Sequence, residues 1–316
     1  MRGFDNKFKD FPDYIIGITK EIWEDRGMGE AMSRYYHPDV IVRMPGSFGR
    51  GEAGMTAATM ATIVQFPDRT LLGQDVIWSG TPEDGMLSSH RILSTATHMG
   101  DGMFGPPTGR KIASLALADC YAKDNMISDE WLIRDSGGIV RQIGGDPKEF
   151  AAENMGKITP FTPDMDVDGP YMGRGNDNAW GAKTADMLTR LMQAEFSLIP
   201  EVYDRAVETH YAGSRTGHGT AAADEFWLGL RSAFPSAQFS VKHVIGREDP
   251  MMPPRAAVRW ALDGTHDGWG AFGRPTGAKV HVMGITHVEY GPWGLRRDYT
   301  LYDEVAIWTQ ILSHTG

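Results

Sequence analysis

Two aspartates, Asp135 and Asp303, could carry out acid–base chemistry. Each follows an aromatic residue by four positions, Trp131 in the first case and Tyr299 in the second, at the end of a predicted strand. A carboxylate on an apolar, aromatic-lined face loses hydration, so its pKa rises toward the range suited to proton transfer. An aspartate that caps the following helix explains the same position equally well. The sequence therefore offers two candidate catalytic carboxylates in matched positions.

Two matched pairs of basic residues add candidate substrate-binding groups. His98 and His266 each end a predicted strand, where an imidazole could serve as a general base or contact substrate. The alternative is a histidine that hydrogen-bonds the adjoining glycine-rich loop. Arg91 and Arg259 lie on a strand that neighbours those of the aspartates and are candidate anchors for an anionic group. We predict that these four residues, with Trp131 and Tyr299, bind substrate.

Other motifs have structural explanations. The segments 100–105 and 268–273 match G-x-G-x-x-G, but Pro-Thr-Gly and then a strand follow each of them. A dinucleotide site needs a helix N-terminus at that point. Cys120, the only cysteine, cannot form an internal disulfide and is read as a small buried hydrophobe rather than a nucleophile. The remaining histidines lack compact ligand spacing. We expect no cofactor and no metal.

Composition narrows the class of protein. A length of 316 residues suits two domains. Acidic residues outnumber basic ones by 41 to 31, and no basic cluster offsets the net charge of −10, so a nucleic-acid partner is not expected. Residues 1–10 are charged and lack the apolar stretch of a signal peptide or membrane helix. The sequence predicts a cytoplasmic protein that binds a small molecule and no membrane.

An internal repeat organises the chain. The segments 97–112 and 265–280 are identical at ten of sixteen positions, at an offset of 168 residues. The same offset pairs Gly51 with Gly219, Arg91 with Arg259, and Gln142 with Gln310 without a gap. A constant register over this length indicates a duplication, which must be recognised before the fold is assigned.

Each copy places helices before strands. Helical spacing is seen at Tyr14, Ile18 and Ile22, and an alanine-rich helix is predicted at 52–65 and again at 220–231. Strands follow, in the first copy at 75–79, 88–98, 111–121 and 127–135. This order predicts an α+β fold with a largely antiparallel sheet. The segment 144–181 is rich in Gly, Pro, Asp and Asn and is predicted to link module A, residues 1–143, to module B, residues 182–316.

The last two strands of each copy are predicted to pair around tight turns at 123–126 and 291–294. This register sets Asp119 opposite Glu130 and His287 opposite Asp298. The first pair is either a like-charge pair with one raised pKa or two solvated carboxylates. The second is either an oriented base, which makes His287 a third candidate catalytic residue, or a plain ion pair. The same register predicts a pocket-lining face that carries Asp135, Trp131, Ile133, Ala116, Ala118 and Cys120.

The repeated residues resemble a known family. The run from Gly264 to Gly268, the Pro-Thr-Gly that ends at Gly277, and then Tyr299, Asp303 and Gln310 are similar to the SnoaL-like polyketide cyclase pattern, and module A repeats it. The resemblance implies the cone of the nuclear transport factor 2 (NTF2-like) superfamily, in which a curved antiparallel sheet wrapped by N-terminal helices encloses an apolar pocket.

The resemblance also implies a chemistry. In the cyclases of this group a pocket aspartate, matched here by Asp135 and Asp303, acts as acid and base in a cofactor-free aldol ring closure. A histidine sometimes assists, and module B has His287 where module A has Asp119. The superfamily also contains isomerases, hydrolases, dehydratases, lyases and pure binding domains, so membership does not fix the reaction.

Three functional hypotheses follow. The first is a cofactor-independent enzyme, a cyclase, lyase, isomerase or dehydratase, that transfers protons on a small apolar or aromatic carbonyl or hydroxy compound. The second makes one module catalytic and the other structural, with the two sheets packed as an internal pseudo-dimer. The third is a binding module without catalysis. The sequence is also compatible with a homo-oligomer of this chain.

Overall fold

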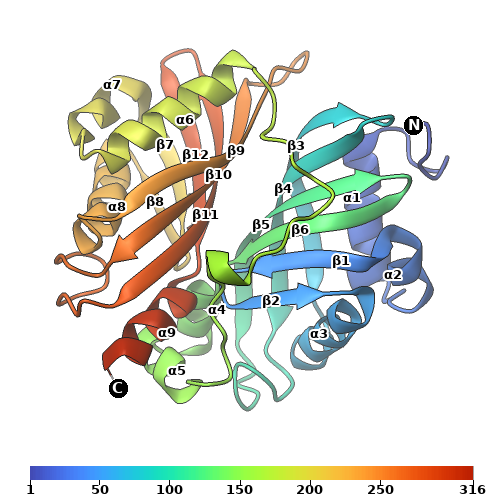
Figure 1. Ribbon diagram of the computed structural model, residues 1–316, viewed down its shortest axis with the longest axis horizontal. Helices are drawn as coiled ribbons and strands as arrows, with labels where there is room; N and C mark the ends of the chain where they lie inside the picture. The colour runs from blue at the N-terminus through green and yellow to red at the C-terminus, as the bar shows by residue number, and fades with distance from the viewer. Residues whose placement is uncertain (316) are drawn as a thin grey trace.

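Two six-stranded sheets dominate the computed structural model, which describes residues 1–315 (Figure 1). The strand order is β2-β1-β6-β5-β4-β3 in module A and β8-β7-β12-β11-β10-β9 in module B. Neighbouring strands are antiparallel except β1 with β6 and β7 with β12, which are parallel. The predicted α+β class and the tandem pair of helix-wrapped sheets are confirmed.

Module A begins with a helix whose apolar residues recur every three to four positions, so that one face is buried. The Asp10 side chain caps this helix by accepting a hydrogen bond from the Asp13 N–H. The elements are α1 (Phe11–Thr19), a π-helical turn (Lys20–Glu24), α2 (Glu30–Tyr35), β1 (Tyr36–Met44), β2 (Ser47–Arg50), α3 (Glu52–Gln65), β3 (Thr70–Thr81), β4 (Gly85–Thr97), β5 (Lys111–Lys123) and β6 (Met126–Arg134).

Module B repeats this order. The turn before each long helix uses a matched glycine with positive φ, Gly51 at 86° and Gly219 at 80°, a conformation that other residues adopt only with strain. The elements are α6 (Ala179–Met192), a 3-10 turn (Phe196–Leu198), α7 (Ile199–Val202), β7 (Tyr203–Tyr211), β8 (Arg215–His218), α8 (Thr220–Ala233), β9 (Gln238–Arg247), β10 (Arg255–Thr265), β11 (Lys279–Gly291), β12 (Gly294–Tyr302) and α9 (Glu304–Thr315).

The segment predicted as a linker contains more structure than its composition indicated. After α4 (Ser136–Ile143), it forms α5 (Pro147–Glu153) and a 3-10 turn (Pro163–Met165). Phe150 of α5 is buried in a cluster with Val305 of α9. The chain then passes between the two sheets on its way to α6 (Figure 1). Phe161 is buried there, and Tyr171 packs against the same cluster. The segment therefore ties the modules together.

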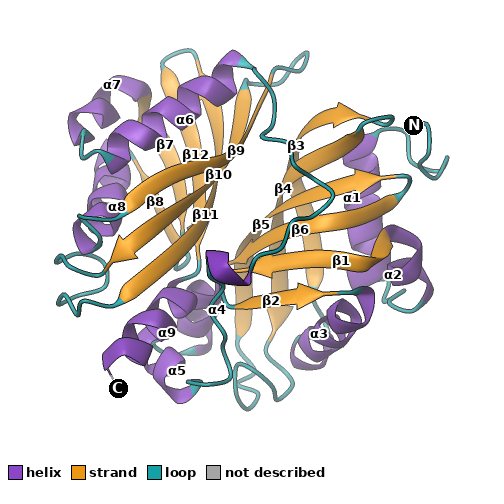
Figure 2. Cartoon of the chain, viewed as in Figure 1, coloured by secondary structure: helices purple, strands orange, loops and turns teal. Residues whose placement is uncertain are grey.

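The two sheets pack against each other through one face of each, and helices cover the other faces (Figure 2). A buried cluster lies between the sheets. Its members come from both modules and from the connecting segment and are Ile77, Leu87, Leu117, Tyr121, Trp131, Ile133, Phe161, Ile245, Ala257, Met283, Ile285 and Leu301. Within residues 1–315, no helix is long and apolar enough to cross a membrane.

The predicted register of the last two strands is correct only next to the turn. In each module one register shift in the strand pair makes the prediction wrong for the residues farther from the turn. Lys123 pairs with Met126 as predicted, but the register shifts between Tyr121 and Ala122, and the same shift occurs between Glu289 and Tyr290. One residue of shift moves every later side chain to the other face of the sheet. Asp119 therefore pairs with Trp131 rather than with Glu130.

The corrected register changes the predicted pocket. His287 pairs with Tyr299, and Asp298 pairs with Val288. Asp119 and Glu130 lie on opposite faces, so the predicted like-charge pair does not form. Trp131 and Ile133 lie in the cluster between the sheets. The small residues Ala116, Ala118 and Cys120 instead share the helix-covered face with Glu130, Leu132 and Arg134.

Candidate active-site cavity

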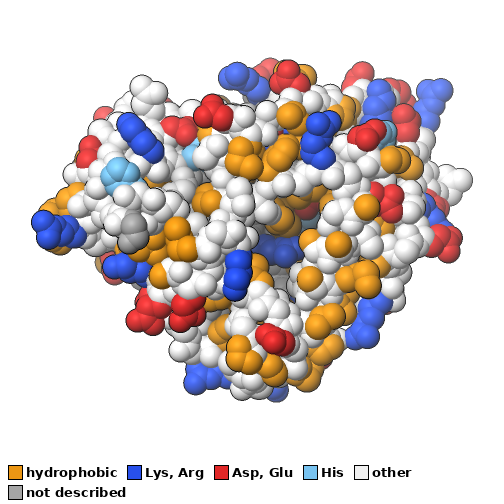
Figure 3. Space-filling view, turned by 60° about the horizontal axis from the view of Figure 1, so that its bottom comes forward, with side chains coloured by type: hydrophobic (Ala, Val, Ile, Leu, Met, Phe, Trp, Pro, Cys, Tyr) orange, Lys and Arg blue, Asp and Glu red, His pale blue; other side chains and the backbone are white. Residues whose placement is uncertain are grey.

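Module A contains a cavity of about 610 Å³ between the helix-covered face of its sheet and its helices. This volume falls in the range of small-molecule sites. Apolar residues such as Ile18, Trp23 and Leu132 form much of its wall. Its titratable lining residues are Tyr36, Arg69, His90, Asp101, Cys120, Glu130, Arg134, Lys157 and Asp303. The face drawn in Figure 3 is hollowed near its centre, with hydrophobic side chains along one margin.

The same space in module B is filled by aromatic side chains. At the repeat offset of 168, Ala58 corresponds to Phe226, Ile92 to Trp260, and Arg134 to Tyr302. The three aromatic residues are buried in one cluster.

A glycine makes room for the largest of these rings. Gly284 stands where module A has Ala116, and a Cβ atom on Gly284 would lie 2.1 Å from Trp260 Cζ2. The duplication therefore produced one hollow module and one solid one.

Glu130 is the buried carboxylate of the cavity. The Tyr36 hydroxyl donates to Glu130 Oε2 at 3.1 Å. Burial raises the pKa of Glu130, and hydrogen bonds from Tyr36 and Cys120 together with the Arg134 charge lower it in part. The matched Asp298 of module B is saturated by hydroxyl donors, Tyr203 at 2.8 Å, Tyr211 at 2.9 Å and Thr300 at 2.7 Å. Of the two carboxylates, Glu130 is the one that faces an open cavity.

His90 is the second buried titratable group of the wall. Its Nδ1 lies 3.2 Å from Ser88 Oγ. Burial lowers the pKa of His90 to about 4, so the imidazole is neutral near neutral pH. Burial also raises the pKa of the Cys120 thiol, which stays protonated. The imidazole of His90 and the thiol of Cys120 are therefore neutral parts of the cavity wall.

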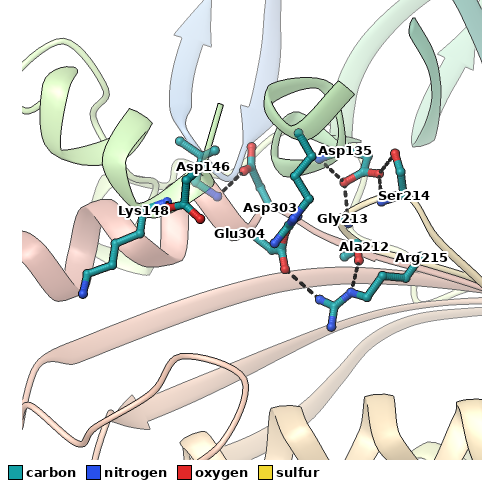
Figure 4. Close-up of polar contacts among 12 residues, drawn as sticks. Asp135, Asp146, Lys148, Ala212, Gly213, Ser214, Arg215, Asp303 and Glu304 are labelled. Atoms are coloured by element: carbon teal, nitrogen blue, oxygen red, sulfur yellow. Dashed lines mark hydrogen bonds and ion pairs between the residues drawn. The ribbon is translucent and has the colours of Figure 1, made fainter. Parts of the chain in front are cut away.

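Asp135 and Asp303 are helix caps that also join the modules (Figure 4). Asp135 accepts hydrogen bonds from the Gly138 N–H at 3.1 Å, the Gly213 N–H at 2.7 Å and the Ser214 N–H at 2.6 Å. It does not line the cavity. Asp303 accepts from the Val305 N–H at 2.9 Å and from the Ser136 hydroxyl at 2.8 Å, and it does line the cavity. Module B thus contributes a carboxylate to the cavity of module A.

Burial raises the pKa of Asp303 to about 6 from its ordinary value of 3.8. Between about pH 4 and pH 6 the folded protein retains a proton that the unfolded chain has released, so this group lowers the free energy of unfolding as pH rises. Asp303→Asn preserves the cap but cannot titrate. We expect its free energy of unfolding to fall across this pH window by up to about 3 kcal/mol less than that of wild type. Urea unfolding of both proteins across this window measures the difference.

Asp146→Asn provides the control for that comparison. Asp146 caps α5 by accepting from the Lys148 N–H at 2.8 Å, and it is exposed. The variant Asp146→Asn therefore measures the effect of the same substitution at an exposed helix cap. A difference between wild type and Asp303→Asn that stayed constant from pH 4 to pH 7 would contradict the prediction.

The predicted substrate residues Arg91, Arg259, Trp131 and Tyr299 lie between the modules rather than at the cavity. The guanidinium of Arg259 stacks on Trp131 at 3.9 Å, and that of Arg91 stacks on Tyr299 at 3.5 Å. At the repeat offset of 168 residues, Arg91 corresponds to Arg259 and Trp131 to Tyr299. The two stacks are therefore equivalent contacts, each between an arginine of one module and an aromatic ring of the other.

Ion pairs and a hydrogen bond complete this interface. Arg259 Nε donates to Asp119 at 2.8 Å, and Arg91 lies 3.5 Å from Glu289. His287, the third predicted catalytic residue, is fully buried, and its Nε2 lies 2.8 Å from Ser89 Oγ of module A. These side chains are therefore occupied by contacts between the modules.

His98 and His266 hold their glycine-rich loops. Nδ1 of His98 lies 3.3 Å from Thr108 Oγ1, and Nδ1 of His266 lies 3.0 Å from Thr276 Oγ1. Each ring also packs near a phenylalanine, Phe66 or Phe234. Neither histidine lines the cavity, and this geometry matches the loop-bonding alternative. In the described part of the chain no three His, Cys, Asp or Glu side chains are grouped to bind a metal ion.

Sequence reasoning missed Glu130, His90 and Arg134 as cavity residues. The predicted register set Glu130 opposite Asp119, away from the predicted pocket face, because the register shift cannot be read from residue types. A usable signal was present in the repeat itself. Aligned positions where module B has an aromatic residue and module A a smaller or polar one mark the space that module A leaves open.

Comparisons with known proteins give one family match and a set of similar solved structures. The family model described as SnoaL-like polyketide cyclase matches residues 183–311. No curated protein matches the chain. Solved structures similar to the chain include the putative polyketide cyclase IdmH of Streptomyces antibioticus, 25% identical, with 43% of this chain and 99% of that one covered and a TM-score of 0.37.

Two further structures are similar over a single module's length. A putative SnoaL-like polyketide cyclase of Jannaschia sp. CCS1 is 18% identical, with 45% of this chain and 97% of that one covered and a TM-score of 0.37. The putative hydroxylase AclR of Streptomyces galilaeus is 18% identical, with 42% and 81% covered and a TM-score of 0.36. The family match thus covers module B, and module A repeats the strand order of module B.

Proposed function

We propose that the chain is a cofactor-independent enzyme whose module A transfers protons on a small carbonyl or hydroxy compound, while module B is structural. The observation that carries this proposal is the contrast between the modules. Module A has a cavity with the buried Glu130 in its wall, whereas aromatic rings fill the matched space of module B around Asp298.

Glu130 suits the role of base in this proposal. A desolvated carboxylate has a raised pKa and takes a proton from a weakly acidic carbon more readily than a hydrated one does. The proton that leaves the carbon next to the carbonyl moves to Glu130, and the electron pair it leaves forms the enolate. Neutral His90 and Tyr36 provide hydrogen-bonding atoms nearby without adding a formal charge.

Asp303, predicted from the sequence, is the second acid–base group of the proposal because it lines the same cavity with its pKa raised to about 6. Two carboxyl groups in different surroundings can divide the tasks of taking and returning a proton. For Asp135, which lies outside the cavity lining, the catalytic role stays a prediction.

Exchange of carbon-bound protons tests the proposal without the natural substrate. In D₂O, the wild-type protein is expected to speed the loss of the α-proton NMR signals of 2-tetralone, a small aromatic ketone. Glu130→Gln should lower the protein-dependent rate by about 10²-fold. Asp298→Asn, the matched change in module B, should leave it within about twofold, because that carboxylate has no cavity in front of it.

Two results would count against the proposal. One is equal rates for wild type and Glu130→Gln in folded proteins with the same near-ultraviolet circular dichroism. The other is binding of 2-tetralone, measured by calorimetry, with no exchange above the buffer rate. That second result would support a binding module instead.

A further inference from the structure

Arg69 and Arg134 are half-buried and differ in their contacts from the four buried arginines of this protein. Arg43 pairs with Asp129, Arg259 with Asp119, Arg255 with Asp75 and Arg91 with Glu289. In residues 1–315, neither Arg69 nor Arg134 forms an ion pair or a side-chain hydrogen bond with the protein, and Arg69 Nε is buried without a partner.

Both side chains line the cavity of module A and lie close enough to repel each other. Burial lowers the pKa of Arg69 to about 9, and the charge of Arg134 contributes to this lowering. Burial lowers the pKa of Arg134 as well. Two guanidinium groups that lose hydration side by side cost free energy unless an anion joins them.

The two carboxylates whose charges act on this pair, and Asp303 of the same cavity, have hydrogen-bond donors of their own. Glu24, which acts on Arg69 through its charge, accepts a hydrogen bond from the Leu71 N–H. Glu130, which acts on Arg134, accepts from Tyr36. Asp303 accepts from Ser136 and the start of α9. None of these oxygens bridges the two guanidinium groups, so their donors remain available to a ligand in the cavity.

We infer that Arg69 and Arg134 bind a carboxylate of the substrate, so that the substrate is an apolar or aromatic carboxylic acid. A guanidinium offers two parallel N–H donors to the two oxygens of a carboxylate. The apolar walls of the cavity suit the remainder of such a molecule. This inference rests on the proposed function in placing substrate in the cavity of module A. It locates the anion site away from Arg91 and Arg259, whose charges are already paired.

A pair of probes that differ in charge tests the inference. By isothermal titration near pH 7.5, wild type should bind 2-naphthoate at least tenfold more tightly than 2-naphthamide, which has the same ring system without the charge. Arg69→Gln and Arg134→Gln should each reduce that preference to less than threefold. Arg50→Gln, an exposed arginine outside the cavity, removes the same net charge and should keep it.

A conservative variant separates binding from folding. Arg134→Lys keeps the charge but loses the forked geometry, so we expect an intermediate preference and an unchanged circular dichroism spectrum. Equal affinities of wild type for the two probes, no detectable binding of either, or a tenfold preference that survives in Arg69→Gln and Arg134→Gln would overturn the inference.

The base variant distinguishes this inference from the proposed function. Glu130→Gln should still prefer 2-naphthoate because both arginines remain. If wild type prefers 2-naphthoate but does not exchange the protons of 2-tetralone, the anion site is supported and the catalytic role is rejected. Exchange that depends on Glu130, without a preference for 2-naphthoate in wild type, would support catalysis and reject the carboxylate-bearing substrate.

Discussion

Trp260→Ala is expected to lower the free energy of unfolding by about 3–5 kcal/mol, the cost of deleting a large aromatic side chain from a core. Trp260 is fully buried, and its Nε1 donates to Thr286 Oγ1 at 3.0 Å. Its ring packs on Trp227 and Phe239 and lies against Gly284. The substitution would leave an unfilled cavity in module B because the surrounding strands cannot collapse into it.

Chemical unfolding followed by circular dichroism measures this loss. Ile92→Ala, at the matched position in module A, is the control. Ile92 borders a space that is already open, so its truncation creates no new closed cavity, and the loss should be well below that of Trp260→Ala. Equal losses at the two positions, or a loss below 1 kcal/mol for Trp260→Ala, would mean that module B is not the solid module.

A second large effect is expected between the modules. Asp119→Asn removes one charge from a pair in which both side chains are buried, and Arg259 then remains charged without its carboxylate. Breaking such a pair from one side costs about 3–5 kcal/mol. Arg43 lies over the same Trp131 ring, and its positive charge repels the unpaired Arg259 further.

Two variants test whether the charge itself is responsible. Adding Arg259→Met to Asp119→Asn removes the stranded cation, so the double variant should be less destabilised than the sum of the single ones. Asp25→Asn makes the same change in the exposed pair with Lys20 and should leave the free energy of unfolding nearly unchanged, because water screens that pair. A small loss for Asp119→Asn, comparable with that of Asp25→Asn, would indicate that water reaches the interface.

The contacts between the modules explain why the repeated arginines and aromatic residues predicted to bind substrate are not in the cavity. Arg91 and Arg259, with Tyr299 and Trp131, form two related stacks across the packed sheets. A residue pattern that repeats in both modules is expected at a pseudo-symmetric interface as well as at two active sites. The distinguishing residues are those that break the repeat, such as Ile92 opposed to Trp260.

The sequence by itself determined the duplication, the α+β class and most elements. The offset of 168 residues survives in the coordinates, and the helix predicted at 52–65 has the predicted bounds. Apolar periodicity and turn residues carry this information locally, so it needs no knowledge of the partner module. The matched positions of Asp135 and Asp303 were also visible, although only the structure shows that both cap helices.

Only the tertiary structure decided which face of each sheet borders the cavity. The register shift at Tyr121 and Ala122 is a property of backbone geometry that no residue type there requires. Because side chains alternate with a period of two, that single shift moved Trp131 to the interface and brought Glu130 and Arg134 to the cavity. The placement of Asp303 in the wall of the other module likewise depends on how the two modules pack, which local sequence does not encode.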